Sequence, residues 1–123
     1  MKKYIFLLFM ASSMAAWSQK TDLNIVNTVK PKKGQKMAFE AAYKIHSAKF
    51  HKANEKVAVY EIMSGPNAGY YHLVNGGRSF ANFDTTRADA TAHSRDLDKT
   101  FYPYLEETMN GVYRWMDSSS FHP

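Results

Sequence analysis

Residues 65–77, GPNAGYYHLVNGG, decide the fold, because turn residues stand on both sides of a short apolar segment. Glycine permits positive φ, proline presets φ for a turn, and asparagine tolerates the left-handed region. The segments 56–63 (KVAVYEIM) and 70–74 (YYHLV) are rich in β-branched and aromatic residues, as strands are. The sequence therefore predicts a β-hairpin whose connection is residues 64–69.

The same glycines could also be interpreted as a phosphate-binding loop. Such a loop runs from a strand directly into a helix and presents its backbone N–H groups to the anion. The first glycine cluster lies between two predicted strands instead. The second cluster, Gly76-Gly77-Arg78-Ser79, lacks the Gly-Lys-Ser/Thr ending. We therefore interpret both clusters as turns, with Asn75-Gly76-Gly77 ending the second strand.

The rest of the chain completes an α+β pattern. Residues 22–29 (DLNIVNTV) alternate as a strand does, and residues 35–52 have helical periodicity. Residues 79–95 have a weak, polar pattern, and residues 99–118 are predicted to form a second long helix. This order predicts an antiparallel sheet with helices on one face. Nothing after the second helix has strand character, so a fourth strand is expected to be missing.

The first helix carries a wide nonpolar arc made of two adjacent stripes. One stripe is Met37, Ala41, Ile45 and Ala48, and the other is Phe39, Tyr43, His46 and Phe50. An arc of this width predicts burial on more than one side, against a second helix or a partner chain. The members of the aromatic stripe are the candidate ligand-binding residues. A histidine in such a stripe is either a satisfied, partly buried side chain or a ligand contact.

Residues 1–18 have the layout of a secretory signal peptide. Basic residues precede an apolar run, and Ala16 and Ser18 stand at the small-residue positions of a cleavage site before Gln19. The apolar run, residues 4–17, is shorter than the roughly 20 residues that span a bilayer. We expect residues 19–123 to form a single exported domain, periplasmic or secreted, with no membrane contact after cleavage. Because the chain has no cysteine, it can form neither a disulfide nor a lipidated N-terminus.

Charge and motif patterns argue against several classes of binding and catalytic site. The net charge is +5, and the densest basic stretch, residues 30–36, has no interleaved aromatic residues, so nucleic-acid binding is not expected. None of the histidines forms an i,i+4 helical pair or an i,i+2 strand pair, and there is no G-x-S-x-G motif. A metal site would need ligands from distant segments. No metal and no cofactor are therefore predicted.

Glu61 and His72 are the candidate catalytic residues. If residues 64–69 form the hairpin connection, Met63 lies opposite Tyr70 and Glu61 lies opposite His72. A carboxylate beside an imidazole could act as a general acid/base pair. It could equally be an ordinary cross-strand charge pair.

Two motifs resemble a known superfamily. The V-x-P-x-x-G entry to the first helix (Val29, Pro31, Gly34), Phe39 within it, and the SG-x-x-x-G-x-Y hairpin are similar to the dimeric α+β barrel proteins. These are ferredoxin-like domains related to antibiotic-biosynthesis monooxygenases and stress-responsive barrel proteins. The resemblance covers roughly residues 22–117. It implies a homodimer in which two sheets pair face to face, with ligands bound between sheet and helices.

The chain departs from this superfamily at two places. The superfamily has a fourth strand after the second helix, so this strand is either absent or lost by truncation of the sequence. The Asn–Trp–His arrangement of the haem-degrading members cannot be placed, because Trp115 lies late in the chain.

Two functions therefore stay open. One is a dimerising domain that binds an apolar or aromatic small molecule or a protein partner. The other is a cofactor-free oxygenase-like or isomerase-like enzyme that uses the same pocket.

Overall fold

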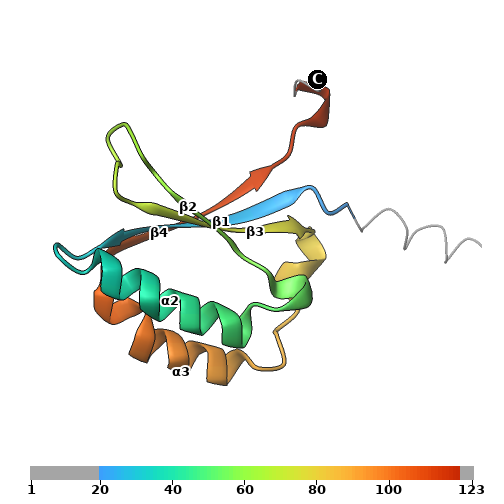
Figure 1. Ribbon diagram of the computed structural model, residues 1–123. Helices are drawn as coiled ribbons and strands as arrows, with labels where there is room; N and C mark the ends of the chain where they lie inside the picture. The colour runs from blue at the N-terminus through green and yellow to red at the C-terminus, as the bar shows by residue number, and fades with distance from the viewer. Residues whose placement is uncertain (1–19, 120–123) are drawn as a thin grey trace, which may run out of the picture.

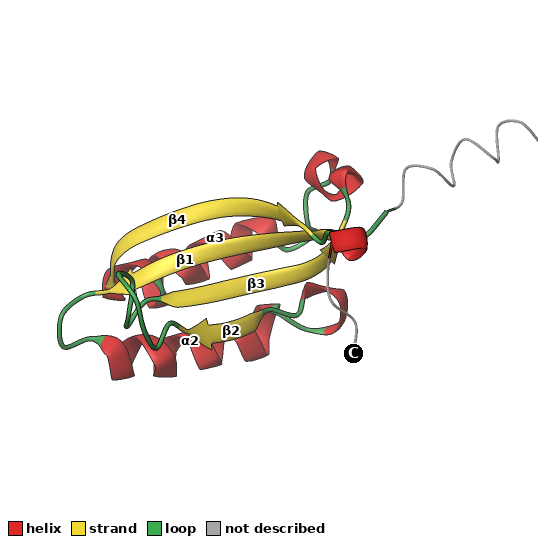
Figure 2. Ribbon diagram, turned by 90° about the horizontal axis from the view of Figure 1, so that it is seen from above, coloured by secondary structure: helices red, strands yellow, loops and turns green. Residues whose placement is uncertain are grey.

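The computed structural model describes residues 20–119, which form an open antiparallel sheet covered on one side by helices. The strands are β1 (Leu23–Pro31), β2 (Ala58–Glu61), β3 (Tyr71–Arg78) and β4 (Leu105–Arg114), and the α-helices are α2 (Lys36–Phe50) and α3 (Ala90–Thr100). The sheet order is β2-β3-β1-β4, and every neighbouring pair is antiparallel. Figure 1 shows both helices below the sheet, and Figure 2 shows the opposite face of the sheet uncovered. The chain thus has an α+β, ferredoxin-like fold, as the sequence predicts.

The predicted absence of a fourth strand is wrong. Residues 105–114, expected within a second long helix, form β4, which pairs with β1 along its length. The second helix is α3, in and just after the segment expected to be irregular. Pro103 disfavours helical backbone at Tyr102, and the chain leaves α3 through a 3₁₀ turn at Tyr102–Tyr104. Pairing with β1 then outweighs the helical spacing of the apolar residues in this segment.

The hairpin exists, but its predicted register is wrong by one residue. The Ile62 N–H donates to the Tyr70 carbonyl, and the Gly69 N–H donates to the Ile62 carbonyl, both at 2.8 Å. The connection is therefore residues 63–69. The second strand also continues through Asn75-Gly76-Gly77 to the end of β3. A slip of one residue turns every side chain to the other face of the sheet.

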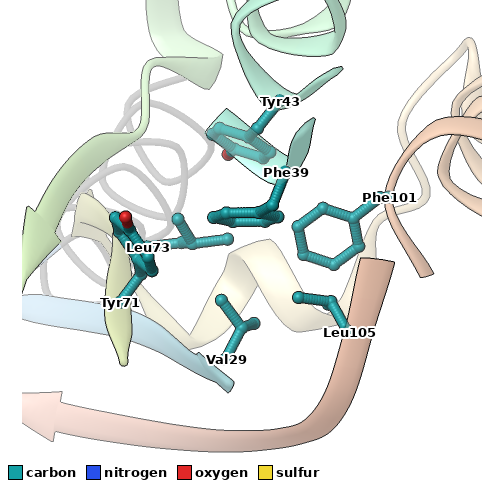
Figure 3. Packing of buried hydrophobic residues seen from close by; sticks show 7 residues of the cluster. All are labelled: Val29, Phe39, Tyr43, Tyr71, Leu73, Phe101 and Leu105. Carbon is teal, nitrogen blue, oxygen red and sulfur yellow. The ribbon is translucent and has the colours of Figure 1, made fainter. Parts of the chain in front are cut away.

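Aromatic and aliphatic side chains from both layers form the core (Figure 3). Its members come from β1, α2, β3 and the segment that enters β4, and they are Val29, Phe39, Tyr43, Tyr71, Leu73, Phe101 and Leu105. The predicted aromatic stripe of the first helix thus faces the sheet, and α3 packs beside α2. In the other stripe, Met37 and Ile45 are exposed. The wide arc is therefore only partly covered within the described residues.

The predicted signal peptide lies outside the described residues. Within residues 20–119, neither α-helix combines the length and the apolar character that a membrane span requires.

Candidate functional site

A cavity of about 150 Å³ lies between the sheet and the two helices. Much of its wall is apolar, contributed by Ile25, Tyr43, Val57, Leu73, Leu97, Phe101 and Tyr102. The polar groups of the wall are two asparagines and three histidines: Asn27, Asn75, His46, His51 and His93. A mainly apolar cavity with a few convergent polar groups is the usual form of a small-molecule site.

The three histidines converge at one end of this cavity. The Nε2 atom of His46 lies 3.2 Å from Nε2 of His51 and 3.2 Å from Nε2 of His93, and the last two lie 3.4 Å apart. His46 is fully buried, and the other two are partly buried. We call these residues the histidine triad. Among residues 20–119, it is the group of histidine and carboxylate side chains whose ligand atoms come close enough to hold one metal ion.

The ends of two helices assemble the histidine triad. His46 lies in α2, and His51 is the residue that caps its C-terminus. At His51 the backbone leaves the helix (φ −112°, ψ 65°), while its N–H still donates to the Ser47 carbonyl at 2.9 Å. This departure from helical geometry lets two histidines five residues apart meet at the same point. His93 reaches them from α3, because the two helices pack side by side.

The outer nitrogens of two of these rings have fixed hydrogen-bond partners. Nδ1 of His46 donates to Oδ2 of Asp96 at 2.7 Å, and Nδ1 of His51 donates to the Glu55 carbonyl at 2.9 Å. Asp96 also accepts a hydrogen bond from the Thr100 hydroxyl at 3.1 Å. Acceptors at Nδ1 hold each ring in the tautomer whose hydrogen is on Nδ1. The Nε2 atoms then carry lone pairs that face one another.

Burial sets the charge state of the site. It lowers the pKa of His51, and it lowers the pKa of His93 to about 4, with the positive charge of Arg87 acting in the same direction. The hydrogen bond from His46 lowers the pKa of Asp96. At neutral pH, two of the rings are therefore neutral and the carboxylate is ionised.

The candidate ligand-binding residues of the sequence all lie near this region. Tyr43 and His46 line the cavity. Phe39 lies in the core, where its ring packs against those of Tyr43 and Phe101, two residues of the cavity wall. The Phe50 ring packs against His46 and His93 at centroid distances of 5.1 and 5.3 Å. The sequence pattern did not single out His51 and His93. Their convergence depends on the cap of α2 and on the packing of α3, which no local spacing reports.

Glu61 and His72 do not meet. Glu61 lies opposite Tyr71 on the helix-facing side and pairs with Lys36, whereas His72 lies opposite Tyr60 on the uncovered side. Nδ1 of His72 hydrogen-bonds to the Thr28 hydroxyl at 2.8 Å. The register shift thus separates the predicted acid/base pair.

Comparisons with known proteins agree on the fold. Neither protein-family models nor curated proteins match this chain. Among solved structures, a NIPSNAP-like domain protein from Burkholderia xenovorans superposes with a TM-score of 0.64 at 12% identity, covering 84% of this chain and 93% of its own. A candidate antibiotic biosynthesis monooxygenase from Bordetella bronchiseptica superposes with a TM-score of 0.60 at 16% sequence identity, covering 76% of this chain and 96% of its own. A second such candidate, from Caulobacter crescentus, superposes with a TM-score of 0.52 at 12% sequence identity, covering 85% of this chain and 99% of its own. Two of these three structures are thus antibiotic-biosynthesis-monooxygenase-like, in agreement with the superfamily that the sequence motifs resemble, and the third is NIPSNAP-like.

Proposed function

We propose that this chain is an exported, homodimerising domain that binds a small, mainly apolar molecule in the cavity between the sheet and the helices. The cavity is the observation that carries the proposal. Its volume of about 150 Å³ is close to that of protein cavities that accept a single aromatic ring. Its apolar walls favour a ring, and the asparagines and histidines supply polar groups that can orient one polar substituent.

Dimerisation is proposed through the uncovered face of the sheet. Large side chains on this face are well exposed, among them Tyr60, Met109 and Tyr113. An apolar patch of this kind commonly marks an interface. In the barrel proteins that the sequence resembles, this same face pairs with a second copy. A second copy is therefore the occupant that we propose.

The enzyme alternative is also supported by a specific observation. Polar groups beside His46, rather than an apolar wall alone, line the cavity. Asn27 lines the cavity as well, and among the described residues its Oδ1 is buried without a hydrogen-bond partner. A buried acceptor without a partner is costly unless a bound group completes it. An oxygenase-like or isomerase-like reaction in this cavity is thus the second candidate function.

Ligand binding is tested with phenol as a ring-sized probe. We expect phenol to shift the NMR signals of cavity residues in wild type, and we expect Val57→Phe to abolish these shifts because the larger side chain occupies the cavity. Val112→Phe is the matched control, since Val112 is 51% exposed and lies outside the cavity. Circular dichroism verifies that each variant is folded. Phenol shifts that are absent in wild type, or equally strong in Val57→Phe, would contradict the proposed site.

Export is tested on protein made in a bacterium that recognises the leader. Because residues 1–18 have the n-region, apolar run and small-residue layout of a signal peptide, we expect the mature chain to begin at Gln19 or within a few residues of it. Intact-mass spectrometry of the extracytoplasmic fraction measures this. Recovery of the chain with Met1 retained would show that the prediction is wrong.

A further inference from the structure

We propose that His46, His51 and His93 bind a divalent transition-metal ion of the Zn²⁺ class through their Nε2 atoms. The three Nε2 atoms lie 3.2, 3.2 and 3.4 Å from one another. Zn²⁺ binds imidazole nitrogen at about 2.0–2.1 Å, and a tetrahedron of that size has ligand atoms about 3.3 Å apart. The triad thus has the dimensions of three corners of a zinc tetrahedron.

The hydrogen bonds of the outer nitrogens leave the Nε2 atoms of His46 and His51 available as metal ligands. A carboxylate and a carbonyl have no hydrogen to give, so His46 and His51 must donate from Nδ1 to Asp96 and Glu55. In a neutral ring the Nε2 atom is then an acceptor only. Two acceptors 3.2 Å apart cannot hydrogen-bond to each other. One proton could lie along one edge of the triangle, whereas a metal ion at its centre satisfies all three nitrogens together.

The surroundings match those of metal sites in other proteins. Metal-binding histidines characteristically donate their other N–H to a carboxylate or a backbone carbonyl, which orients the ring and strengthens the ligand. His46 and His51 both do so. The Asp96 carboxylate also supplies negative charge beside the ion, and the Phe50 ring packs over the site. Imidazole ligands suit Zn²⁺, Co²⁺, Ni²⁺ and Cu²⁺, and the tetrahedral dimensions favour Zn²⁺ or Co²⁺.

Three protein ligands leave one position of the tetrahedron open. The three histidines line the cavity, and Asn27 lines it too, with its Oδ1 buried and without a partner among residues 20–119. Zinc sites with three protein ligands hold a water molecule or a substrate group at the fourth position. The geometry therefore assigns this position to water or to a small anionic or neutral donor that enters through the cavity. Metal binding itself does not depend on the proposed phenol site.

Zn²⁺ and Co²⁺ titrations of the tag-free chain, residues 19–123, test the proposal. By calorimetry we expect one Zn²⁺ per chain, and with Co²⁺ we expect the intense visible absorption of a tetrahedral complex. His93→Ala removes one ligand, so the Zn²⁺ affinity should fall by more than the roughly 10–100-fold that loss of an outer hydrogen-bond partner costs. His72→Ala is the matched control, because His72 lies on the other face of the sheet and should leave both titrations unchanged.

Further variants separate the site from a loss of folding. His51→Ala should behave as His93→Ala does, and circular dichroism confirms that both remain folded without metal. Asp96→Asn should weaken Zn²⁺ binding by about 10–100-fold while keeping the tetrahedral Co²⁺ spectrum, because Asp96 positions His46 without touching the ion. Azide should shift the Co²⁺ bands if the fourth position is open.

The proposal is overturned by wild-type protein that binds neither ion saturably, or by His93→Ala and His51→Ala that bind as wild type does. If His72→Ala lowered the Zn²⁺ affinity as much as His93→Ala does, the ion would not be bound at the triad. An octahedral Co²⁺ spectrum would contradict the tetrahedral geometry, and bands unmoved by azide would contradict the open position. Phenol binding measured without metal remains a separate result, so the two proposals can fail independently.

Discussion

Replacing Phe39 with alanine is expected to lower the free energy of unfolding by about 3–5 kcal/mol, the range seen when a large aromatic side chain is removed from a core. Phe39 is 1% exposed, and its ring contacts those of Tyr71, Phe101 and Tyr43 at centroid distances of 5.1, 5.8 and 6.0 Å. Through this ring α2 contacts both the sheet, at Tyr71, and the segment before β4, at Phe101 (Figure 3). Its removal leaves a void that the surrounding rings can fill only in part.

Urea unfolding followed by far-ultraviolet circular dichroism measures this loss. Met37→Ala is the matched control on the same helix, because Met37 is 83% exposed, and its effect should stay within about 0.5 kcal/mol. Phe39→Leu keeps part of the buried volume, so it gives a measurable transition if the alanine variant does not fold. A free energy of unfolding for Phe39→Ala within about 1 kcal/mol of wild type would show that this ring is not at the centre of the core.

The part of the fold that the sequence predicts correctly is the part with strong local chemistry. Turn residues before Tyr71 marked the hairpin, and the apolar stripe containing Phe39 and Tyr43 marked both the first helix and its buried face. The end of the chain has no such local signal. Leu105, Met109 and Val112 keep helical spacing, yet they lie in β4, where pairing with β1 decides the structure. Long-range pairing of this kind leaves little trace in a single sequence.

The candidate site was harder to predict for a related reason. His46 stood out because it lies in an aromatic stripe, but its two partners come from a helix cap and from another helix. Neither arrangement produces a recognisable spacing. Conversely, Glu61 and His72 were paired by an assumed turn length, and one extra residue in the turn placed them on opposite faces. Register in a hairpin is fixed by the turn, so a small error there removes a whole site.

The substitution Val74→Lys is expected to raise the dissociation constant of the proposed homodimer by about 100-fold or more. This corresponds to a loss of about 3 kcal/mol in the free energy of association. Val74 lies between Val26 of β1 and Ala58 of β2, near the middle of the uncovered face. In a face-to-face dimer its side chain would be removed from water by the opposing sheet. A lysine there would have to bury its ammonium group without a partner or hold the two sheets apart.

Sedimentation velocity over a range of concentrations measures the association. Wild type is expected to be a dimer, Val74→Lys a monomer at the same concentrations, and Val112→Lys a dimer as in wild type. Val112 is the matched control because it also lies in a strand and is 51% exposed, but it lies opposite Ile25 on the helix-facing side. A wild-type chain that remains monomeric at high micromolar concentration would disprove dimerisation. A Val112→Lys variant that dissociates while Val74→Lys stays dimeric would place the interface elsewhere. The contrast between two lysines on opposite faces of one sheet thus separates an effect on the interface from a general effect of added charge.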